Sequence, residues 1–341
     1  KNTHPQHKIL VTFFSPSGYE VKKNSTAAHI ITYLPLDTQA NAKKFIKAVN
    51  PELAVFIKYE FWPNYLSTLK KNGVKTLLIS GIFRREQVFF KPWGGFMRHS
   101  LKSFQHFFVQ DEDSQALLNS IGFTNVTVSG DTRFDRVLEI LQRDNTLDFI
   151  TDFKQDKLCV VAGSTWPEDE ALLIKHINND KTATKYIIAP HNIKQPHIAE
   201  LKGSIKRKTV LFSEKEGNKL SDSDVFIIDT VGLLTKIYSY ANIAYVGGGM
   251  GNTGLHNVLE PAVFGIPVII GKNYQKFKEA RELLSGGGLV SVDNNDGFTQ
   301  IMLKLTAEST LRSAMGNKNK AYIFEQKGAK DRIIYYINSI L

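Results

Sequence analysis

The chain has 341 residues, of which 42% are hydrophobic and 22% charged, as in globular proteins, so intrinsic disorder is excluded. At about 150 residues per domain, this length predicts two domains, each with its own core. A formal charge of +10 predicts a negatively charged partner, which can be a membrane surface, a phosphorylated substrate or a nucleic acid. Cys159 is the only cysteine, so an intrachain disulfide is excluded and a reducing compartment fits.

Three further classes of protein are disfavoured. No stretch approaches the ~20 apolar residues that span a bilayer, and no signal-peptide pattern is present, which predicts a water-soluble body. The nine histidines are scattered without metal-ligand spacing, so we expect neither a metal nor another cofactor. Nucleic-acid binding is suggested by charge alone, because no aromatic and basic repeat or known module supports it, and no nucleic-acid partner is expected.

Apolar strand-like runs alternate with amphipathic stretches, the pattern of a mostly parallel α/β sheet. In the first half, strands are expected at Lys8 to Phe14, Leu53 to Lys58, Lys75 to Ser80, His106 to Gln110 and Val126 to Ser129. In the second half they are expected at Leu158 to Ala162 (with Cys159 buried), Tyr186 to Ala189, Val210 to Phe212, Val225 to Ile228, Ile243 to Val246, Val268 to Ile270 and Leu289 to Val292. The polar, turn-rich stretch from Glu139 to Lys157 predicts a linker. The expected architecture is two doubly wound domains with ligand at the cleft between their carboxyl strand ends.

In the first half of the chain, Glu60 is the strongest candidate for a functional carboxylate. It follows a predicted strand and precedes Phe61 to Asn64, which places it at a carboxyl strand end, where α/β proteins concentrate chemistry. Two interpretations stay open. The carboxylate can cap the amides of the following helix, or it can lie in the cleft as a functional residue.

The segment from Phe83 to Lys102 mixes cations with aromatic residues and holds a single acid. Its five cations are Arg84, Arg85, Lys91, Arg98 and Lys102, and its apolar residues include Phe89, Phe90, Trp93, Phe96 and Met97. One interpretation is a helix with aromatics inward and charges outward. We predict instead a surface that docks on anionic lipid, with cations on phosphates and aromatics in the membrane interface.

Two polar groups follow predicted strands of the second half. Gly163, Ser164 and Thr165 precede a helix expected to start near Pro167, and they can hold a carboxylate or phosphate or can cap that helix. Pro190 and His191 end the next strand, although a lone histidine is usually structural.

The most informative segment runs from Val246 to Ala262. It follows a buried strand, and its glycines, Gly247, Gly248 and Gly249, would let the backbone approach a ligand. The free N–H groups in the first turn of the following helix are suited to phosphate, and the glycine amides could add to them. A helix is expected to begin near Asn257, which can cap it or bond a ligand. Glu260 offers an acceptor for both hydroxyls of a ribose. A tight turn without a ligand is the alternative interpretation.

This run resembles the donor-site motif of GT-B glycosyltransferases, in particular the 3-deoxy-D-manno-octulosonic acid (Kdo) transferases of Gram-negative lipopolysaccharide synthesis. Other segments resemble signatures of the same family in the expected order: Thr12 to Glu20, Tyr33 to Asp37, Lys58 to Asn64, Ser129 to Asp135, Ala162 to Trp166, Ala189 to His191, and Asp229 to Gly232. The resemblance covers essentially the whole chain.

The resemblance implies an α/β protein of GT-B type, in which two doubly wound Rossmann-like domains face a cleft. It implies an acceptor domain at residues 1–145, which binds a lipid A precursor (lipid IVA), and a nucleotide-sugar domain at residues 154–341, which binds CMP-Kdo. Transfer would be inverting and metal-independent, at the cytoplasmic face of the inner membrane. Donor-binding residues would be Gly163, Ser164, Thr165, Pro190, His191, Gly247, Gly248, Gly249, Asn257 and Glu260, with Glu60 catalytic and Ser15, Ser17 and Gly18 on the acceptor side beside the five cations.

The start of the chain departs from the family pattern. Similar transferases place a strand and helix before the first strand predicted here, with a Gly-Glu pair whose glutamate serves as general base, and commonly begin with a membrane anchor. We therefore expect the first domain to lack its first strand and helix in this chain, the natural product to be longer, and activity to depend on the missing base. The alternatives are another nucleotide-sugar GT-B enzyme, such as a UDP-sugar transferase, and a non-catalytic lipid- or nucleotide-binding relative.

Overall fold

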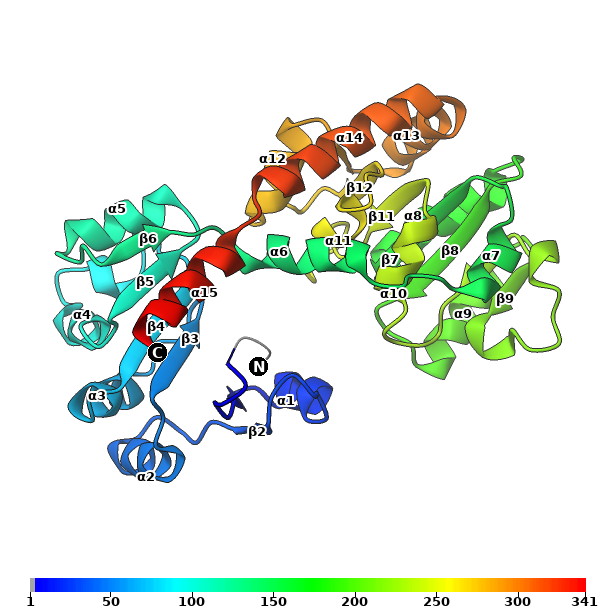
Figure 1. Cartoon of the computed structure of the whole chain (residues 1–341). Coiled ribbons are helices and arrows are strands. Elements are labelled where there is room, and N and C mark those ends of the chain that lie inside the picture. Colours follow the sequence, from blue (N-terminus) through cyan, green and yellow to red (C-terminus); the bar gives the residue numbers. More distant parts are fainter. Residues whose placement is uncertain (1–3) are drawn as a thin grey trace. The chain divides into compact units, whose positions relative to one another are not determined.

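The computed structural model describes residues 4–341 and divides into two compact units, which are considered separately (Figure 1). The first unit contains residues 4–131 together with Lys330–Leu341, and the second is Thr132–Ala329. Both are α/β units with parallel strands.

The second unit is built on a seven-stranded parallel sheet of order β13-β12-β11-β7-β8-β10-β9. The strands are β7 (Cys159–Thr165), β8 (Lys185–Pro190), β9 (Thr209–Leu211), β10 (Val225–Ile227), β11 (Ile243–Val246), β12 (Val268–Gly271) and β13 (Leu289–Val292). The α-helices are α6 (Thr132–Leu138), α7 (Asp148–Lys154), α8 (Pro167–Asn179), α9 (Gln195–Ser204), α10 (Leu234–Ile237), α11 (Leu259–Ala262), α12 (Lys278–Ser285), α13 (Asn295–Ala307) and α14 (Ser309–Glu325). Short 3₁₀ helices are η2 (Glu139–Gln142), η3 (Phe212–Glu214), η4 (Leu220–Asp222) and η5 (Tyr238–Tyr240).

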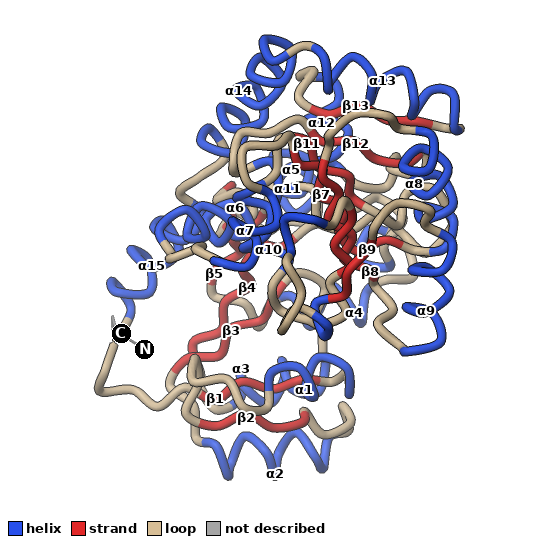
Figure 2. The backbone as a smooth tube through the Cα atoms, turned by 90° about the vertical axis from the view of Figure 1, so that its right-hand side faces the viewer, coloured by secondary structure: helices blue, strands red, loops and turns tan. Residues whose placement is uncertain are grey.

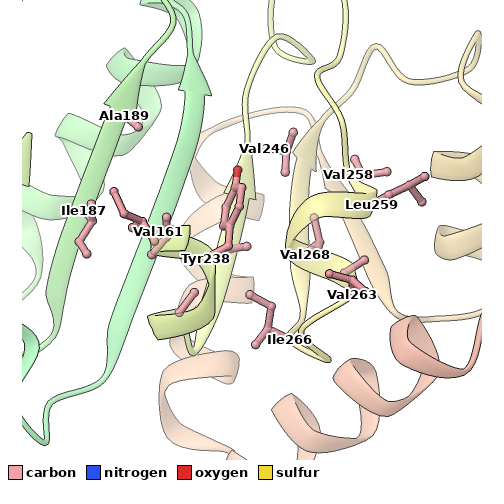
Figure 3. Packing of buried hydrophobic residues seen from close by; sticks show 14 of the residues in the cluster. Val161, Ile187, Ala189, Tyr238, Val246, Val258, Leu259, Val263, Ile266 and Val268 are labelled. Atoms are coloured by element: carbon pink, nitrogen blue, oxygen red, sulfur yellow. The ribbon is translucent and has the colours of Figure 1, made fainter. Parts of the chain in front are cut away.

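Alternate residues of these strands supply two separate cores, one on each face of the sheet. Val161, Ile187 and Val246 point to one face, where they pack with residues of α7, α10, α11 and α14. Val160 and Tyr245 point to the other face, against α8, α9 and α13. Figure 3 shows side chains of the first core converging from β7, β8, β11, β12 and the segment around α11. Because a strand buried on both faces has no polar side, these strands are continuous apolar runs in the sequence.

The strand order reverses between β7 and β11. From β7 the chain adds β8 on one side, and later it returns to add β11 on the other. In open parallel sheets, ligands bind at the carboxyl ends of the strands at such a reversal. The loops that follow β7 and β11 are therefore the expected place for a ligand in this unit.

The first unit has two parallel sheets, β1-β2 and β3-β4-β5-β6. The strands are β1 (Leu10–Phe13), β2 (Ile30–Tyr33), β3 (Leu53–Ile57), β4 (Lys75–Gly81), β5 (His106–Val109) and β6 (Val126–Val128). The helices are α1 (Pro16–Lys22), α2 (Gln39–Val49), α3 (Pro63–Lys71), η1 (Val88–Phe90), α4 (Gly95–Leu101), α5 (Glu112–Ser120) and α15 (Ala329–Ile340). Figure 2 shows β1 and β2 running side by side with α1 alongside them. The main core of the first unit is aromatic, with Phe83, Phe89, Phe104 and Phe107 almost fully buried.

All twelve predicted strands are confirmed to within a few residues, and one strand, β2, was missed. Cys159 is fully buried on β7 as predicted, and burial raises the pKa of its thiol to about 12. The prediction that Glu139 to Lys157 is a linker is wrong. Ile150 and Phe153 of α7 are fully buried in the core of the second unit, so this stretch is structural.

The last helix also departs from the expected range of 154–341 for the second domain. α15 returns to the first unit, where the Tyr336 ring lies 4.7 Å from that of His106 on β5 and the Arg332 guanidinium donates to the Ser129 carbonyl oxygen at 2.9 Å. Over residues 4–341, no helix combines the length and apolar character needed to cross a membrane.

Candidate functional site

The loops after β7 and β11 pack backbone against backbone at the strand reversal. A Cβ on Gly247 would lie 2.4 Å from the Ser164 carbonyl oxygen, and a Cβ on Gly163 would lie 2.1 Å from the Tyr238 hydroxyl. Gly248 has φ +88°, and a Cβ there would lie 2.0 Å from the carbonyl oxygen of Gly254. Glycine is therefore required here by close packing within the protein itself.

The amides of this glycine loop are largely engaged by protein groups. Gly247 N donates to Gly163 O at 2.9 Å, and Gly248 N donates to the Asp169 carboxylate at 2.7 Å. Met250 N approaches the same carboxylate at 3.4 Å. The expectation that Gly247 and Gly248 offer free donors to a phosphate is therefore wrong, because Asp169 already supplies the negative charge.

Asp169 is the buried residue that organises this end of the sheet. Its side chain is fully buried on the first turn of α8, and it also accepts from Trp166 N at 3.0 Å and from the Tyr245 hydroxyl at 2.7 Å. Burial, with Asp169 nearby, raises the pKa of Tyr245 far above its usual range. Four donors, three backbone amides and one hydroxyl, therefore satisfy the oxygens of this buried carboxylate.

Glu260 and Asn257 lie together at the start of α11. Asn257 Nδ2 donates to Glu260 at 3.2 Å, and the Thr235 hydroxyl donates to its other oxygen at 3.3 Å. Asn257 Oδ1 accepts from Leu259 N at 3.2 Å, so Asn257 bonds the first amide of the helix from the position before its N-cap, Val258. α11 has only four residues and begins at Leu259, two residues later than expected. The Glu260 carboxylate is partly buried and keeps acceptor capacity for ligand hydroxyls.

Thr165 is part of a buried network. Its hydroxyl donates to Glu170 at 3.0 Å, and the His197 imidazole lies 3.1 Å from the same carboxylate. Thr165 is 1% exposed. The helix predicted near Pro167 does begin there, but its N-cap residue is Trp166 and the Thr165 hydroxyl bonds Glu170, so the predicted capping role of Thr165 is wrong. Of the three predicted residues Gly163, Ser164 and Thr165, Ser164 is the partly buried one, and its backbone has φ +55°.

Three rings stack where β7, β8 and the glycine loop meet. Pro190 is the last residue of β8, and His191 N donates to Thr165 O at 2.9 Å. The His191 ring stacks on Trp166 with centroids 4.4 Å apart and planes 19° apart. The His256 ring lies 4.9 Å from that of His191, and Trp166 Nε1 donates to His256 Nε2 at 3.0 Å. His191 is therefore no isolated structural histidine but the exposed member of a cluster.

In the first unit, Glu60 is exposed just beyond the carboxyl end of β3. It accepts a hydrogen bond from Trp62 Nε1 at 2.6 Å, and the Trp62 ring lies 4.8 Å from that of Phe14. The helix-capping interpretation of Glu60 is wrong. Asp37, from the loop after β2, accepts from the amides of Asn64 and Tyr65 in the first turn of α3.

The acceptor-side residues predicted near the start of the chain lie at the end of β1. Ser15 and Ser17 are exposed, and their hydroxyls are 2.7 Å apart. A Cβ on Gly18 would lie 2.9 Å from the Phe13 ring, so this glycine lets α1 pack on β1. The Phe14–Trp62 contact joins this loop to the one that carries Glu60, so both belong to one edge of the first unit.

The basic and aromatic segment from Phe83 to Lys102 is divided between core and surface. Phe89 is 3% exposed and belongs to the core, whereas Trp93 is 76% exposed and Phe96 75% exposed. Phe90 and Met97 are partly buried against the same core. The expectation that Phe89 faces a membrane is therefore wrong.

The cations of this segment divide in the same way. Arg84, Arg85 and Lys102 are exposed, and Lys91 is partly buried. Arg98 is partly buried and its guanidinium donates to the carbonyl oxygens of Phe89 and Lys91, which gives it a structural role. The Arg84 guanidinium lies over the Tyr59 ring at 5.7 Å. Arg84, Arg85, Trp93, Phe96 and Lys102 are called the exposed patch below.

The sequence reasoning missed Asp169, Trp166 and His256 as site residues. In the sequence, the acidic residues after Pro167 indicated only the start of a helix. His256 stood out only as part of the segment from Val246 to Ala262. In the part of the chain that the structure describes, no group of three or more His, Cys, Asp or Glu side chains could hold a metal ion.

Solved structures with a similar fold define the class. A Neisseria meningitidis UDP-GlcNAc 2-epimerase bound to UDP-GlcNAc matches with a TM-score of 0.59 at 14% identity, over 95% of this chain and 92% of that one. A Staphylococcus aureus MnaA–UDP co-structure matches with a TM-score of 0.60 at 16% identity, over 97% of each chain. The protein is an α/β protein of GT-B type with two Rossmann-like domains.

Sequence relatives make the assignment more specific. The family model described as 3-deoxy-D-manno-octulosonic-acid transferase (kdotransferase) matches residues 1–136. A transferase of that name from Chlamydophila psittaci is 26% identical over 96% of this chain and 77% of its own length. One from Aquifex aeolicus is 28% identical over 90% of this chain and 80% of its own. The chain is therefore similar to Kdo transferases over most of its length, and the family model matches its first 136 residues.

Proposed function

We propose that this protein is a glycosyltransferase of lipopolysaccharide biosynthesis that transfers Kdo from CMP-Kdo to a lipid A precursor, lipid IVA. The observation that carries the proposal is a similarity to Kdo transferases that runs through both units, as in the Haemophilus influenzae relative, which aligns with 97% of this chain. Among the motif residues of the second unit, those after β7 and β11 lie at the strand reversal.

The chemistry asks for three things: stabilisation of the leaving CMP, a positioned acceptor hydroxyl and removal of its proton. For the donor, Glu260 and Asn257 would hold the ribose, while Ser164, His191 and His256 would face the phosphate or carboxylate. Pro190, Thr165 and the three glycines would act through the backbone that shapes this site. Transfer would be inverting and would need no metal or cofactor.

For the acceptor, the first unit would supply Glu60 together with Ser15, Ser17 and Gly18. Within residues 4–341, Glu60 accepts from the Trp62 indole, which holds the exposed carboxylate in place and leaves its second oxygen for an acceptor hydroxyl. We propose that Glu60 orients the acceptor or holds developing charge.

The exposed patch of the first unit supports a location at the cytoplasmic face of the inner membrane. Trp93 and Phe96 are apolar side chains that the core does not use, and Arg84, Arg85 and Lys102 are exposed in the same segment. Aromatic side chains partition into the membrane interface, and each cation near an anionic surface contributes about 1 kcal/mol. Lys91, which is partly buried, would contribute less.

The function is tested by incubating the full natural protein with CMP-Kdo and lipid IVA and analysing the lipid by mass spectrometry. We expect a product heavier by one or more Kdo residues, with release of CMP and inverted anomeric configuration by NMR. Thermal shift with CMP, UMP and UDP separates the alternatives. A stronger shift with UMP or UDP would indicate another nucleotide-sugar transferase, and CMP binding without any product would indicate a non-catalytic relative.

A further inference from the structure

The hydrogen bond between Trp166 and His256 indicates which ring nitrogen of His256 carries a proton. An indole Nε1–H can only donate, so the atom that receives it, His256 Nε2 at 3.0 Å, must be without a proton. A histidine that accepts at Nε2 is neutral and carries its single proton on Nδ1. The partner therefore selects both the charge and the tautomer of His256.

The surroundings of His256 favour the same state. Burial is the largest cause that lowers the pKa of His256, the neighbouring His191 lowers it further, and Asp169 acts in the opposite direction. His191, after β8, and Asp169, on α8, are the titratable groups that act on this ring. Trp166, after β7, and the glycine loop bring no charge of their own.

The ring is also fixed in position against the glycine loop. His256 N donates to Gly247 O at 3.1 Å, and a Cβ on Gly248 would lie 3.2 Å from His256 Cδ2. Among residues 4–341, the structure shows no protein group that bonds His256 Nδ1. That N–H is consequently available to a ligand at the carboxyl end of the sheet.

We propose that Trp166 is a positioning residue whose indole N–H locks His256 as a neutral imidazole protonated at Nδ1, so that the glycine loop offers an anionic ligand a neutral N–H donor rather than a cation. Trp166 also holds His191 by stacking, which keeps the second imidazole beside the first. This inference goes beyond the proposed function, because it describes the ligand-free site and does not depend on which donor binds.

The test is long-range ¹H–¹⁵N NMR on the full chain labelled with ¹⁵N-histidine, followed through a pH titration, with His256 assigned by comparison with His256→Gln. We expect the wild-type His256 to show an unprotonated Nε2 and a protonated Nδ1 at neutral pH. In Trp166→Phe, which retains a stacking ring but lacks the donor, the titration midpoint of His256 should rise and Nε2 should become partly protonated. Trp62→Phe, which removes the indole donor to Glu60 in the first unit, is the matched control and should leave His256 unchanged.

Two results would overturn the proposal. One is a wild-type His256 protonated at Nε2, and the other is an identical titration of His256 in wild type and in a Trp166→Phe protein whose backbone spectrum shows it is folded. A second readout is the affinity for CMP as a function of pH, which should follow the titration of His256 in Trp166→Phe and stay flat over that range in wild type. Equal pH dependence in both proteins would also count against the inference. Absence of CMP binding in every variant would contradict the proposed function and leave the tautomer result standing.

Discussion

The carboxylate of Asp169 accepts a hydrogen bond from the backbone N–H of Gly248 at 2.7 Å, across 79 residues of sequence. Because of this contact the Gly248 amide is already bonded within the protein, although the glycine loop looks suited to phosphate. The fully buried Asp169 carboxylate bonds the Gly248 amide from the protein side, and this bond holds that part of the loop in place.

The first prediction is that Asp169→Asn destabilises the second unit by about 3 kcal/mol. An asparagine keeps one acceptor oxygen and turns an NH₂ group toward donors, so contacts to Gly248, Trp166 and Tyr245 cannot all be kept. Urea unfolding measures the effect. Asp222→Asn is the control, because Asp222 forms exposed ion pairs and its loss should cost no more than about 1 kcal/mol. Equal midpoints for the two variants would show that Asp169 does not organise the loop.

The second prediction concerns Glu260. Replacing it by alanine should weaken CMP binding by about 1.5 to 3 kcal/mol, since a partly buried charged acceptor for the ribose is lost. Isothermal titration calorimetry with CMP measures this. Glu216→Ala, at an exposed ion pair of the same unit, should bind as wild type. If a folded Glu260→Ala protein retains wild-type affinity, Glu260 is not a ribose ligand.

The third prediction separates acceptor chemistry from donor binding. Glu60→Gln should lower turnover of the natural protein at least tenfold and leave CMP affinity unchanged, because Glu60 belongs to the first unit and the donor residues to the second. Steady-state transfer assays and calorimetry provide the two measurements.

Glu52→Gln is the matched control for Glu60, since Glu52 precedes the amino end of β3 and pairs with His7 at 3.1 Å. It should have wild-type turnover. Trp62→Phe, which removes the partner of the Glu60 carboxylate, should give a smaller loss than Glu60→Gln. Full activity of Glu60→Gln would remove Glu60 from the mechanism.

The fourth prediction concerns the exposed patch. The double variant Arg84→Glu with Arg85→Glu should reduce binding to anionic vesicles at least about tenfold at low salt, because reversing two cations removes more than their individual attraction. Arg98 is unsuitable for this test, since its guanidinium bonds two carbonyl oxygens. Co-sedimentation with anionic and zwitterionic vesicles measures the effect and its salt dependence.

The aromatic part of the patch is tested separately. Trp93→Ser with Phe96→Ser should lower vesicle binding with little change in salt sensitivity, because an apolar contribution is removed. Tyr335→Ser is the control, as Tyr335 is 80% exposed on α15, outside the patch. Equal vesicle binding by wild type and both patch variants would rule this surface out.

The fifth prediction is a loss of stability in mild acid. Burial lowers the pKa of His106 and of His176, so the unfolded chain takes up these protons more readily than the folded one. Stability should therefore be complete above about pH 7 and fall as the pH drops through about 6.5, the usual histidine value.

Thermal unfolding between about pH 7.5 and 5.5 measures this, in a range above most carboxyl pKa values. His176→Asn should be less stable at neutral pH because contacts with Phe298 and Tyr186 are lost, yet its midpoint should depend less on pH. An unchanged slope in that variant would assign the pH dependence elsewhere.

The sequence by itself determined where the strands lie, that both units are parallel α/β structures, where the strand-end motifs stand and which family they resemble. These properties are local: a buried strand is a short apolar run, and a motif is read from adjacent residues. The same locality explains the missed strand, because β2 (Ile30–Tyr33) is short and its end residues are exposed.

Only the tertiary structure decided which partners satisfy the polar groups at those motifs. Asp37 rather than Glu60 bonds the start of α3, Asp169 occupies glycine-loop amides that looked free, and Trp166 reaches His256 across 90 residues of sequence. Likewise, the sequence of α7 predicted a linker, but two of its residues, Ile150 and Phe153, are buried in the core. Buried donors and acceptors must be paired, but the pairing joins residues distant in sequence, so it follows from the folded packing rather than from any local pattern.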